Sequence, residues 1–342
     1  MLVLVTLSDV AQLAGVSPST VSRVVNNNGY VSEAIAKRVM DAVAELDYRP
    51  NVVARSFRSK TTMTIGVVVS DLTNSYFMDA LGGIEEVLSP EGYLLLIASS
   101  NNVVSRELQY CLEFDHRRVD GTILASAGAS PAKLSTVFRK DSRVVLIDRM
   151  IDGAGFDCVL DDNESGVNQL VEYLVEQGHQ TFGVVSGPLS ISAGSERVDA
   201  FERALARAGY DVRPEWKWIG EFTDEYGYGA GQLLAALQEK PSAVFCANNA
   251  LAQGLLLSLN DAGIRVPDDV SVVSYGTLAN GKLFRTTVTC VEQPARETGR
   301  AGARLLLERI RGNDEPYQVL RIPPRLSLGE SVRRIESLRT NR

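Results

Sequence analysis

Histidine, cysteine and tryptophan are scarce in this chain of 342 residues, which contains two histidines, four cysteines and two tryptophans. His116 and His179 do not have the spacing of metal ligands. The cysteines are far apart, form no C-x-x-C pair and lie in or beside apolar stretches, as is typical of buried reduced thiols; they are Cys111, Cys158, Cys246 and Cys290. We therefore expect no metal, no cofactor and no disulfide framework.

Long apolar runs are also missing, and none reaches the length that spans a bilayer. The first ten residues, MLVLVTLSDV, have neither a basic region nor a small-residue cleavage site, so they do not predict a secretory signal. Hydrophobic residues make up 45% of the chain and charged residues 23%, which is enough for an ordinary buried core. We expect two or three compact units in a cytoplasmic protein without a membrane partner.

One loop has part of a phosphate-binding motif. The stretch SVVSYGTLANGKLF, residues 271–284, leads from a β-branched run into Gly276, Gly281 and Lys282. Leu283 stands where the motif needs a hydroxyl to hold magnesium, and a short β-branched run follows instead of a long helix. The chain also has no G-x-G-x-x-G fingerprint and no nucleophile with a matching base, so we expect neither a nucleotide site nor an enzyme.

Charge is divided unevenly along the chain. Residues 1–60 contain seven Lys or Arg against five acids, whereas the remaining residues contain 28 bases and 37 acids. A basic head on an acidic body favours a head that meets a polyanion while the body does not.

The head has the pattern of three short helices. Thr6 and Asp9 form a capping box, after which Val10, Leu13 and Ala14 mark one apolar face and Gly15 ends the first helix. Ser17 can cap a second helix with Pro18 at its first position. A third helix starts at Ser32 and carries apolar residues at helical spacing, namely Ile35, Val39, Val43 and Leu46.

The second helix has two unlike sides. Its core side carries Val21, Val24 and Val25, and its other side carries short polar groups, namely Ser19, Ser22, Arg23 and Asn26. Two helices joined at a glycine turn, the second with a polar row, are typical of a helix-turn-helix that fits the major groove. Arg23 can then donate two parallel hydrogen bonds to guanine O6 and N7. On spacing alone, a helical bundle with a solvated polar face remains the alternative.

Residues 6–32, TLSDVAQLAGVSPSTVSRVVNNNGYVS, and residues 46–59, LDYRPNVVARSFRS, closely resemble the lactose repressor / galactose repressor family. The resemblance covers residues 6–331. It implies a homodimeric transcriptional regulator, expected to be a repressor of carbohydrate-related genes, that binds palindromic operator DNA and a small effector. A periplasmic type of sugar-binding protein has similar lobes, but the head and the lack of a signal argue against it.

In that family, the stretch corresponding to Asn51–Ser59 is a hinge helix that orders on the operator and inserts a leucine into the minor groove. Phe57 stands at that leucine's position, where it is an apolar wedge or packs against the body. Ile35 and Ala36 replace the usual Thr-Arg, which removes one expected backbone contact. The residues expected to bind DNA are Thr6, Ser17, Ser19, Thr20, Ser22, Arg23, Asn26, Asn51, Ala54, Arg55 and Phe57.

From Thr64 the body alternates strand and helix patterns. Apolar runs at 64–70, 93–98, 121–126 and 143–148, then at 181–186, 216–220, 242–247 and 270–275, predict eight strands in two groups of four. Helix-length segments separate them at 76–89, 105–118, 131–139, 195–208, 225–239 and 248–262. The expected fold class is therefore α/β, with two lobes of parallel sheet covered on both faces. With the resemblance, the architecture becomes a helix-turn-helix head on a two-lobed body like that of periplasmic binding proteins.

We expect four segments. They are a DNA-binding head at 1–50, a hinge helix and linker at 51–61, an effector-binding and dimerisation body at 62–335, and a tail at 336–342 that is too short for a tetramerising zipper. One lobe should comprise about 62–161 with 292–320, and the other 162–291 with 321–335.

Parallel sheets bind ligands beyond the carboxyl ends of their strands, and the resemblance puts the effector pocket at the same places. A carboxylate and an amide can bind adjacent hydroxyls, an Arg can hold an anion, and an aromatic ring can cover a sugar. The alternative for each polar residue is a helix cap. The candidates are Asp71, Asn74, Tyr76, Phe77, Asp148, Arg197, Phe222, Asn248, Gly276 and Thr277.

Gly276 and Thr277 occupy the position where sugar-sensing relatives usually carry Asp-Asp or Asp-Asn. Losing that carboxylate makes the cleft less negative around Arg197, which favours a ligand with its own negative charge. We therefore hypothesise a sugar acid or sugar phosphate as the effector. The alternatives are a neutral sugar or no small ligand at all.

Overall fold

The computed structural model describes residues 5–26, 28–49, 61–139, 141–278 and 286–335. The chain divides into two compact units, Met1–Thr62 and Met63–Arg342, which we call the head and the body. In the described part of the chain, no helix combines the length and the apolar character that crossing a membrane requires.

The head contains the three expected helices, α1 (Leu7–Ala14), α2 (Pro18–Val25) and α3 (Glu33–Glu45). Thr6 and Asp9 form the predicted capping box, and Gly15 ends α1 in the left-handed region with φ of 62°. Ser17 caps α2 by accepting from the Thr20 amide. Leu13 was expected in the core but is 46% exposed, because Val10, Ala11 and Ala14 already fill the contact with the other helices.

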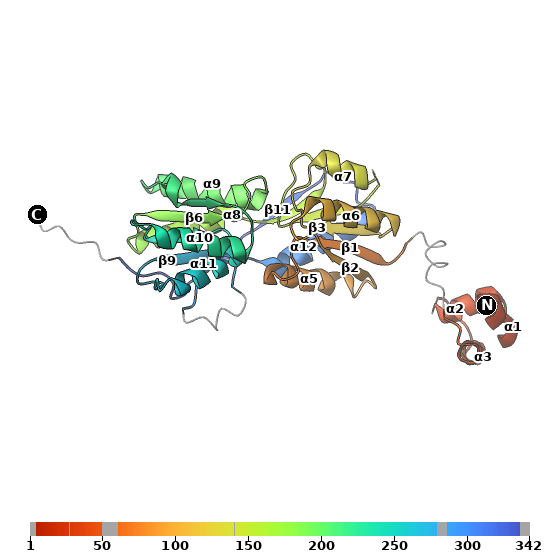
Figure 1. The fold of residues 1–342 in the computed structure, drawn as a ribbon. Coiled ribbons are helices and arrows are strands. Elements are labelled where there is room, and N and C mark those ends of the chain that lie inside the picture. Colours follow the sequence, from red (N-terminus) through yellow and green to blue (C-terminus); the bar gives the residue numbers. More distant parts are fainter. Residues whose placement is uncertain (1–4, 27, 50–60, 140, 279–285, 336–342) are drawn as a thin grey trace, which may run out of the picture. The chain divides into compact units, whose positions relative to one another are not determined.

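The first lobe of the body is a parallel sheet in the order β11-β5-β4-β3-β1-β2. Its strands are β1 (Thr64–Val69), β2 (Leu94–Ser99), β3 (Gly121–Leu124), β4 (Val144–Ile147), β5 (Asp157–Asp161) and β11 (Val319–Ile322). The helices α5 (Ser75–Leu88) and α12 (Ala295–Ile310) cover one face, and α6 (Val104–His116) and α7 (Pro131–Val137) cover the other (Figure 1).

The second lobe is a sheet in the order β12-β10-β9-β8-β6-β7, in which only the β10–β12 pairing is antiparallel among the described strands. Its strands are β6 (Phe182–Ser186), β7 (Lys217–Ile219), β8 (Ala243–Cys246), β9 (Ser271–Tyr275), β10 (Thr289–Glu292) and β12 (Arg325–Ser327). Its helices are α8 (Asn163–Glu176), α9 (Ser192–Arg207), α10 (Asp224–Ala236) and α11 (Asn249–Asp261), with a 3-10 turn at Pro214–Trp216.

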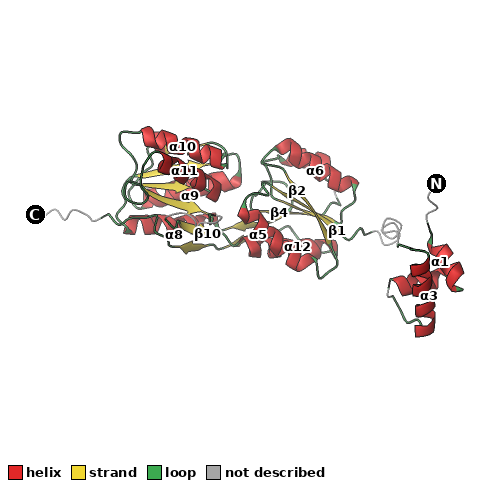
Figure 2. Cartoon of the chain, turned by 60° about the horizontal axis from the view of Figure 1, so that its bottom comes forward, coloured by secondary structure: helices red, strands yellow, loops and turns green. Residues whose placement is uncertain are grey.

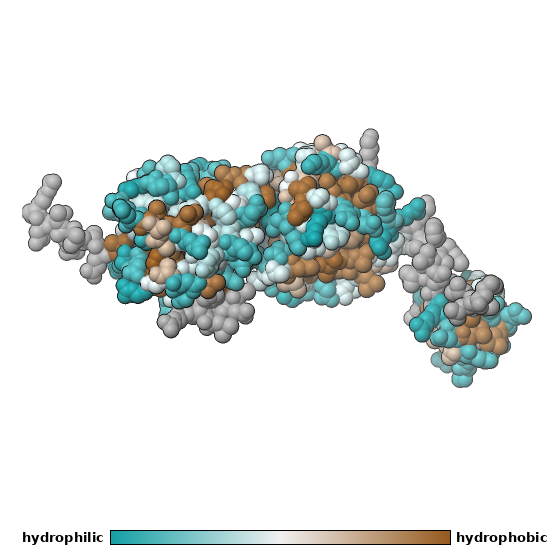
Figure 3. Space-filling model, in the orientation of Figure 1, coloured by the Kyte–Doolittle hydropathy of each residue, from teal (hydrophilic) through white to brown (hydrophobic). Residues whose placement is uncertain are grey.

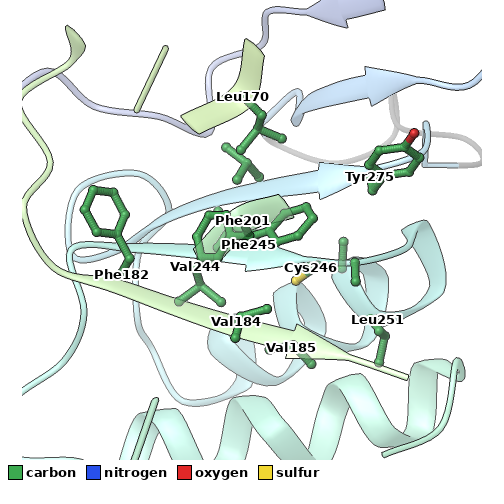
Figure 4. Packing of buried hydrophobic residues seen from close by; sticks show 14 of the residues in the cluster. Leu170, Phe182, Val184, Val185, Phe201, Val244, Phe245, Cys246, Leu251 and Tyr275 are labelled. Carbon is green, nitrogen blue, oxygen red and sulfur yellow. The ribbon is translucent and has the colours of Figure 1, made fainter. Parts of the chain in front are cut away.

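Aromatic rings form the centre of the second lobe. Phe201 and Phe245 have ring centroids 4.8 Å apart, and the Phe182 ring lies edge-on to Phe201 at 6.4 Å (Figure 4). All three side chains are fully buried. Such a core holds the carboxyl ends of β6, β8 and β9 in fixed positions at the edge where ligands bind in these folds.

The expectation of eight strands in two groups of four is wrong, because the described residues form twelve strands in two groups of six. The missing strands are β5, β10, β11 and β12, and the pattern also omitted α8 and α12. These strands have only three to five residues, so none gives a long apolar run, and β11 is also largely exposed. Figure 2 shows the two sheets, in yellow, each in its own lobe and flanked by helices.

The chain passes between the lobes three times, at Asp161–Asp162, at Gln293–Pro294 and at Pro323–Pro324. The third passage lies two residues beyond the expected boundary at 320, since β11 continues to Ile322. Two consecutive prolines have no amide hydrogen to extend the ladder, which is why the strand ends there.

Candidate functional site

The polar side of α2 is exposed in the head. The Arg23 side chain is exposed and makes no hydrogen bond or ion pair with any other described residue. Ser17 and Thr6 are helix caps, and the Ser17 hydroxyl lies 2.7 Å from that of Ser19 and 2.8 Å from that of Thr20. Arg23 therefore has its full set of donors available for a ligand.

Two other predicted head residues are partly committed to the helix. The Asn26 amide donates to the Ser22 carbonyl at 2.7 Å and lies 3.3 Å from its hydroxyl, so Asn26 closes the last turn of α2. Its amide oxygen has no such partner among the described residues. Asn51, Ala54, Arg55 and Phe57 lie outside the described residues.

A small inner pocket of about 30 Å³ lies between the two lobes. It is lined by seven of the ten predicted effector residues, namely Asn74, Tyr76, Phe77, Asp148, Arg197, Phe222 and Asn248. It is also lined by four residues that the sequence pattern missed, namely Arg149, Ala193, Asn249 and Gln293. A volume of this size holds one or two water molecules, so a sugar enters only if side chains or lobes move.

The other three predicted residues lie elsewhere. Asp71 lines a second, larger cavity and is partly exposed. Gly276 and Thr277 line neither cavity in the described part of the chain. Gly276 has φ of 93°, and a β carbon on it would lie 2.7 Å from Oε1 of Gln293. The backbone and the neighbouring Gln293 therefore both favour glycine at this position.

Arg197 is buried and bound from several sides. It donates to Oδ1 of Asn163 and to the Ala247 carbonyl, both at 2.9 Å. Its guanidinium lies 3.8 Å from an Asp148 oxygen and 3.9 Å from the centroid of the Tyr275 ring. The Arg197 charge is thus largely compensated within the protein, more than the sequence predicted.

Asp161 is the second carboxylate beside Arg197, at 3.9 Å, and the sequence pattern missed it. It accepts from Gln293 at 2.6 Å, which joins two of the three passages between the lobes. Burial raises the pKa of Asp161 to about 6, although the Arg197 charge acts in the opposite direction. Its other oxygen has no hydrogen-bond partner among the described residues, as is also true of the Tyr76 and Thr298 hydroxyls.

Arg149 is the second cation in the pocket and immediately follows Asp148, with which it forms an ion pair at 3.3 Å. One of its terminal nitrogens donates to Asn102 and to the Ser126 carbonyl at 2.9 and 2.8 Å. Its guanidinium also lies 5.6 Å from the Phe222 ring of the other lobe. Its Nε is the atom that faces Asp148 in that ion pair, and it makes no hydrogen bond to another described residue.

A buried carboxylate, Glu107, also acts electrostatically on Arg149. Glu107 is fully buried, accepts from the Ser126 hydroxyl at 3.0 Å and also accepts from the Ala127 amide. Burial raises the pKa of Glu107 above its ordinary value. The charges of Glu107, Arg149, Asp148 and Arg197 therefore alternate in sign from the first lobe to the second.

The larger outer cavity has about 480 Å³ and shares Asn74, Phe222 and Asn249 with the inner pocket. Its other lining side chains are mostly amides, hydroxyls and carboxylates, namely Asp71, Thr73, Ser75, Asn101, Asn102, Thr223, Asp224, Glu225, Ala250 and Gln253. A volume of about 300–1,000 Å³ is typical of small-molecule sites. In the described part of the chain, no cluster of His, Cys, Asp and Glu is arranged to hold a metal ion.

Residues 6–51 match the family model described as "Bacterial regulatory proteins, lacI family", and residues 171–332 match that of a "Periplasmic binding protein-like domain". The HTH-type transcriptional repressor PurR of Vibrio vulnificus is 33% identical over 332 residues, covering 96% of this chain and 99% of that protein.

Solved structures are similar over the same length. The lac repressor dimer bound to operator and the anti-inducer ONPF superposes with a TM-score of 0.85 at 26% identity, covering 96% of this chain and 99% of that one. The complex of the transcriptional regulator CelR with cellobiose has a TM-score of 0.70 at 30% identity, again covering 96% and 99%.

Proposed function

Because the chain belongs to the lactose repressor / galactose repressor family of bacterial transcriptional regulators, we propose that it is a homodimeric repressor that binds palindromic operator DNA under the control of a small effector. The exposed, unpaired Arg23 on α2 is the observation that carries the proposal. Such a regulator acts on the chromosome, which places it in the cytoplasm, and the genes that it controls are proposed to be carbohydrate-related.

In the proposed DNA complex, α2 lies in the major groove and Arg23 binds a guanine through two parallel hydrogen bonds. The Ser19 and Ser22 hydroxyls and the free oxygen of Asn26 flank it on the same side of the helix. One head reads one half-site, so a palindrome needs two heads related by two-fold symmetry.

Exposed apolar side chains on the first lobe support a dimer. Leu94 and Ile97 on the edge strand β2 are 72% and 46% exposed, and Met78 on α5 is 53% exposed. Figure 3 shows apolar residues gathered on the surface of this lobe. An apolar edge strand is an aggregation hazard in a monomer, and pairing two subunits would bury it. Sedimentation of Leu94→Lys should show a larger monomer fraction than the unchanged chain, and an unchanged distribution would remove β2 from the interface.

The proposed effector is a sugar acid or sugar phosphate. Arg149 is the group that supports this proposal, because among the described residues it forms one ion pair, with Asp148, whereas Arg197 lies beside two carboxylates. The acceptors for hydroxyls are Asp148 and the Asn248 side chain. The helices α5, α9, α10 and α11 also begin at this edge, and helix N-termini favour negative charge. The compensation of Arg197 by Asp148 and Asp161 supports the alternative, which is a neutral sugar.

Titration calorimetry with gluconate, a sugar phosphate and the matching neutral sugar separates the two effector classes. Arg149→Met should abolish the heat of an acidic ligand and leave that of a neutral sugar. Heat with neutral sugars alone would end the proposal of an anionic effector, and the DNA-binding role would still stand.

Footprinting of a palindromic probe tests the regulator itself. The full chain should protect a symmetric site, and a chain without residues 1–60 should protect none. Failure of the full chain to protect any site would refute the DNA-binding role, whichever ligand the body binds.

A further inference from the structure

Two asparagine side chains connect the lobes across the mouth of the inner pocket. Asn74 precedes α5 in the first lobe, and Asn249 is the first residue of α11 in the second (Figure 1). The Asn74 amide nitrogen donates to Oδ1 of Asn249 at 3.0 Å, and the Asn249 nitrogen donates to Oδ1 of Asn74 at 3.1 Å. The two amides therefore form a reciprocal pair that requires the lobes to be closed.

Each amide is also fixed by its own helix. Oδ1 of Asn74 accepts from the Tyr76 amide at 3.0 Å, and Oδ1 of Asn249 accepts from the Ala250 amide at 3.0 Å. The Asn249 nitrogen donates in addition to the Thr277 carbonyl at 3.2 Å. The pair thus joins the N-termini of two helices to the backbone that follows β9. A neutral amide suits this position, because it supplies both a donor and an acceptor next to two helix ends with partial positive charge.

The same two side chains line both the inner pocket of about 30 Å³ and the outer cavity of about 480 Å³. Phe222 is the third residue shared by the two cavities. A ligand larger than one or two water molecules that reaches Arg149 from the outer cavity must separate the amides as it enters. Entry of the ligand and release of the interlobe contact are therefore linked events.

We propose that Asn74 and Asn249 are positioning residues that form a latch, which holds the lobes closed over the inner pocket and couples this closure to the backbone at Thr277. The latch is a property of the body without ligand or DNA. Its test therefore has an outcome that is independent of the effector class and of operator binding.

Carboxylates at both positions provide the sharpest test. Asn74→Asp keeps the cap on α5 and still accepts from Asn249, and Asn249→Asp keeps its contact with Ala250 and still accepts from Asn74. Each single variant therefore retains one bond of the pair, whereas the double variant has two acceptors, no donor and two like charges in contact. At pH 8 the ratio of closed to open body should fall about fivefold or less in each single variant and more than tenfold in the double variant.

Closure is measured in the full-length, ligand-free protein by the distance between two nitroxide labels. Lys133→Cys on α7 and Asp199→Cys on α9 place one label on an exposed position of each lobe, and the four native thiols are buried. Labelled chains are mixed with an excess of unlabelled chains, so that each measured distance lies within one subunit. The double variant should show a longer distance at pH 8 and return to the closed distance at pH 5, where a shared proton restores a donor.

A matched control carries the same added charge outside the pair. Asn74→Asp with Gln253→Glu places two carboxylates on the outer cavity but leaves the Asn249 donor in place, so this variant should stay closed. If the double variant does not fold, Asn249→Ala takes its place as the test. This variant breaks both amide hydrogen bonds without adding charge, and it should lower the closed fraction. The proposal is overturned if the double variant is as closed as the unchanged protein at pH 8, if the control opens equally, or if Asn249→Ala has no effect.

Discussion

His179 makes the stability of the second lobe sensitive to acid. The imidazole is fully buried just beyond the end of α8. Its Nε2 lies 3.2 Å from the Arg333 carbonyl, to which it donates, and its Nδ1 lies 3.0 Å from the Ser242 hydroxyl oxygen. The ring thus ties the entrance of β8 and the segment that follows β12 to the end of α8. Burial disfavours the charged ring and lowers the pKa of His179 from 6.5 to about 4.

The lowered pKa fixes the sign of the effect. Between pH 6.5 and pH 4 the unfolded chain binds a proton at this position and the folded chain does not, so the folded state loses stability as the pH falls through this interval. One pKa unit corresponds to about 1.4 kcal/mol, so the loss is about 3 kcal/mol when the pH reaches 4. A domain is stable by about 5–15 kcal/mol in total, so the loss is large enough to measure.

Urea unfolding at pH 7 and at pH 4.5 measures the effect. Trp216 and Trp218 are buried in the same lobe, so their fluorescence reports its unfolding. His179→Gln should remove about 2–3 kcal/mol of the difference between the two pH values. His116→Gln, at an exposed histidine, should leave the difference unchanged. An equal pH dependence in the unchanged protein and in His179→Gln would refute the reasoning.

Two further substitutions test the packing of the body. Gly299→Ala should destabilise it by about 1–3 kcal/mol or more in thermal unfolding, because the new β carbon would lie 2.0 Å from a backbone carbonyl of α5. The control is Gly229→Ala, whose β carbon meets no atom within 4 Å, so this variant should be neutral or stabilised by about 0.5–1 kcal/mol. Asp157→Asn should cost about 3 kcal/mol in urea unfolding, because it leaves the charge of Arg309, held at 2.7 and 2.9 Å, without its carboxylate partner. Glu91→Gln at an exposed ion pair should cost less than about 1 kcal/mol, and similar costs for both would contradict the role of burial.

Local patterns predicted the parts of the fold that depend on neighbouring residues. The capping box of Thr6 and Asp9, the cap at Ser17 and the stop at Gly15 are each set within a few residues, and all three are present. The buried strands β1, β6, β8 and β9 were likewise visible as apolar runs. The strands β11 and β12 were not, because such short strands are specified by pairing with distant partners and not by their own composition.

The pocket residues likewise divide into those that the sequence pattern predicts and those that depend on distant parts of the chain. Residues at the carboxyl ends of strands, such as Asp148 and Asn248, follow from topology alone. Asp161 and Gln293 reach the pocket through the passages between lobes, which the pattern of alternating elements does not locate. The neutralisation of Arg197 by two carboxylates depends on distances across the cleft, so it could not be read from the sequence.

The central claim is that the polar side of α2 reads operator DNA, and the affinity of Arg23→Ala for an operator selected from random palindromes tests it most directly. Loss of two hydrogen bonds to a base should weaken binding by about 1–3 kcal/mol for each half-site, or roughly 5- to 150-fold for each of the two, and relax the preference at one base pair in each half-site. Arg304→Ala, which removes the same charge from α12 of the body, should bind as the unchanged protein does. An Arg23→Ala protein with undiminished affinity and unchanged sequence preference would contradict the account.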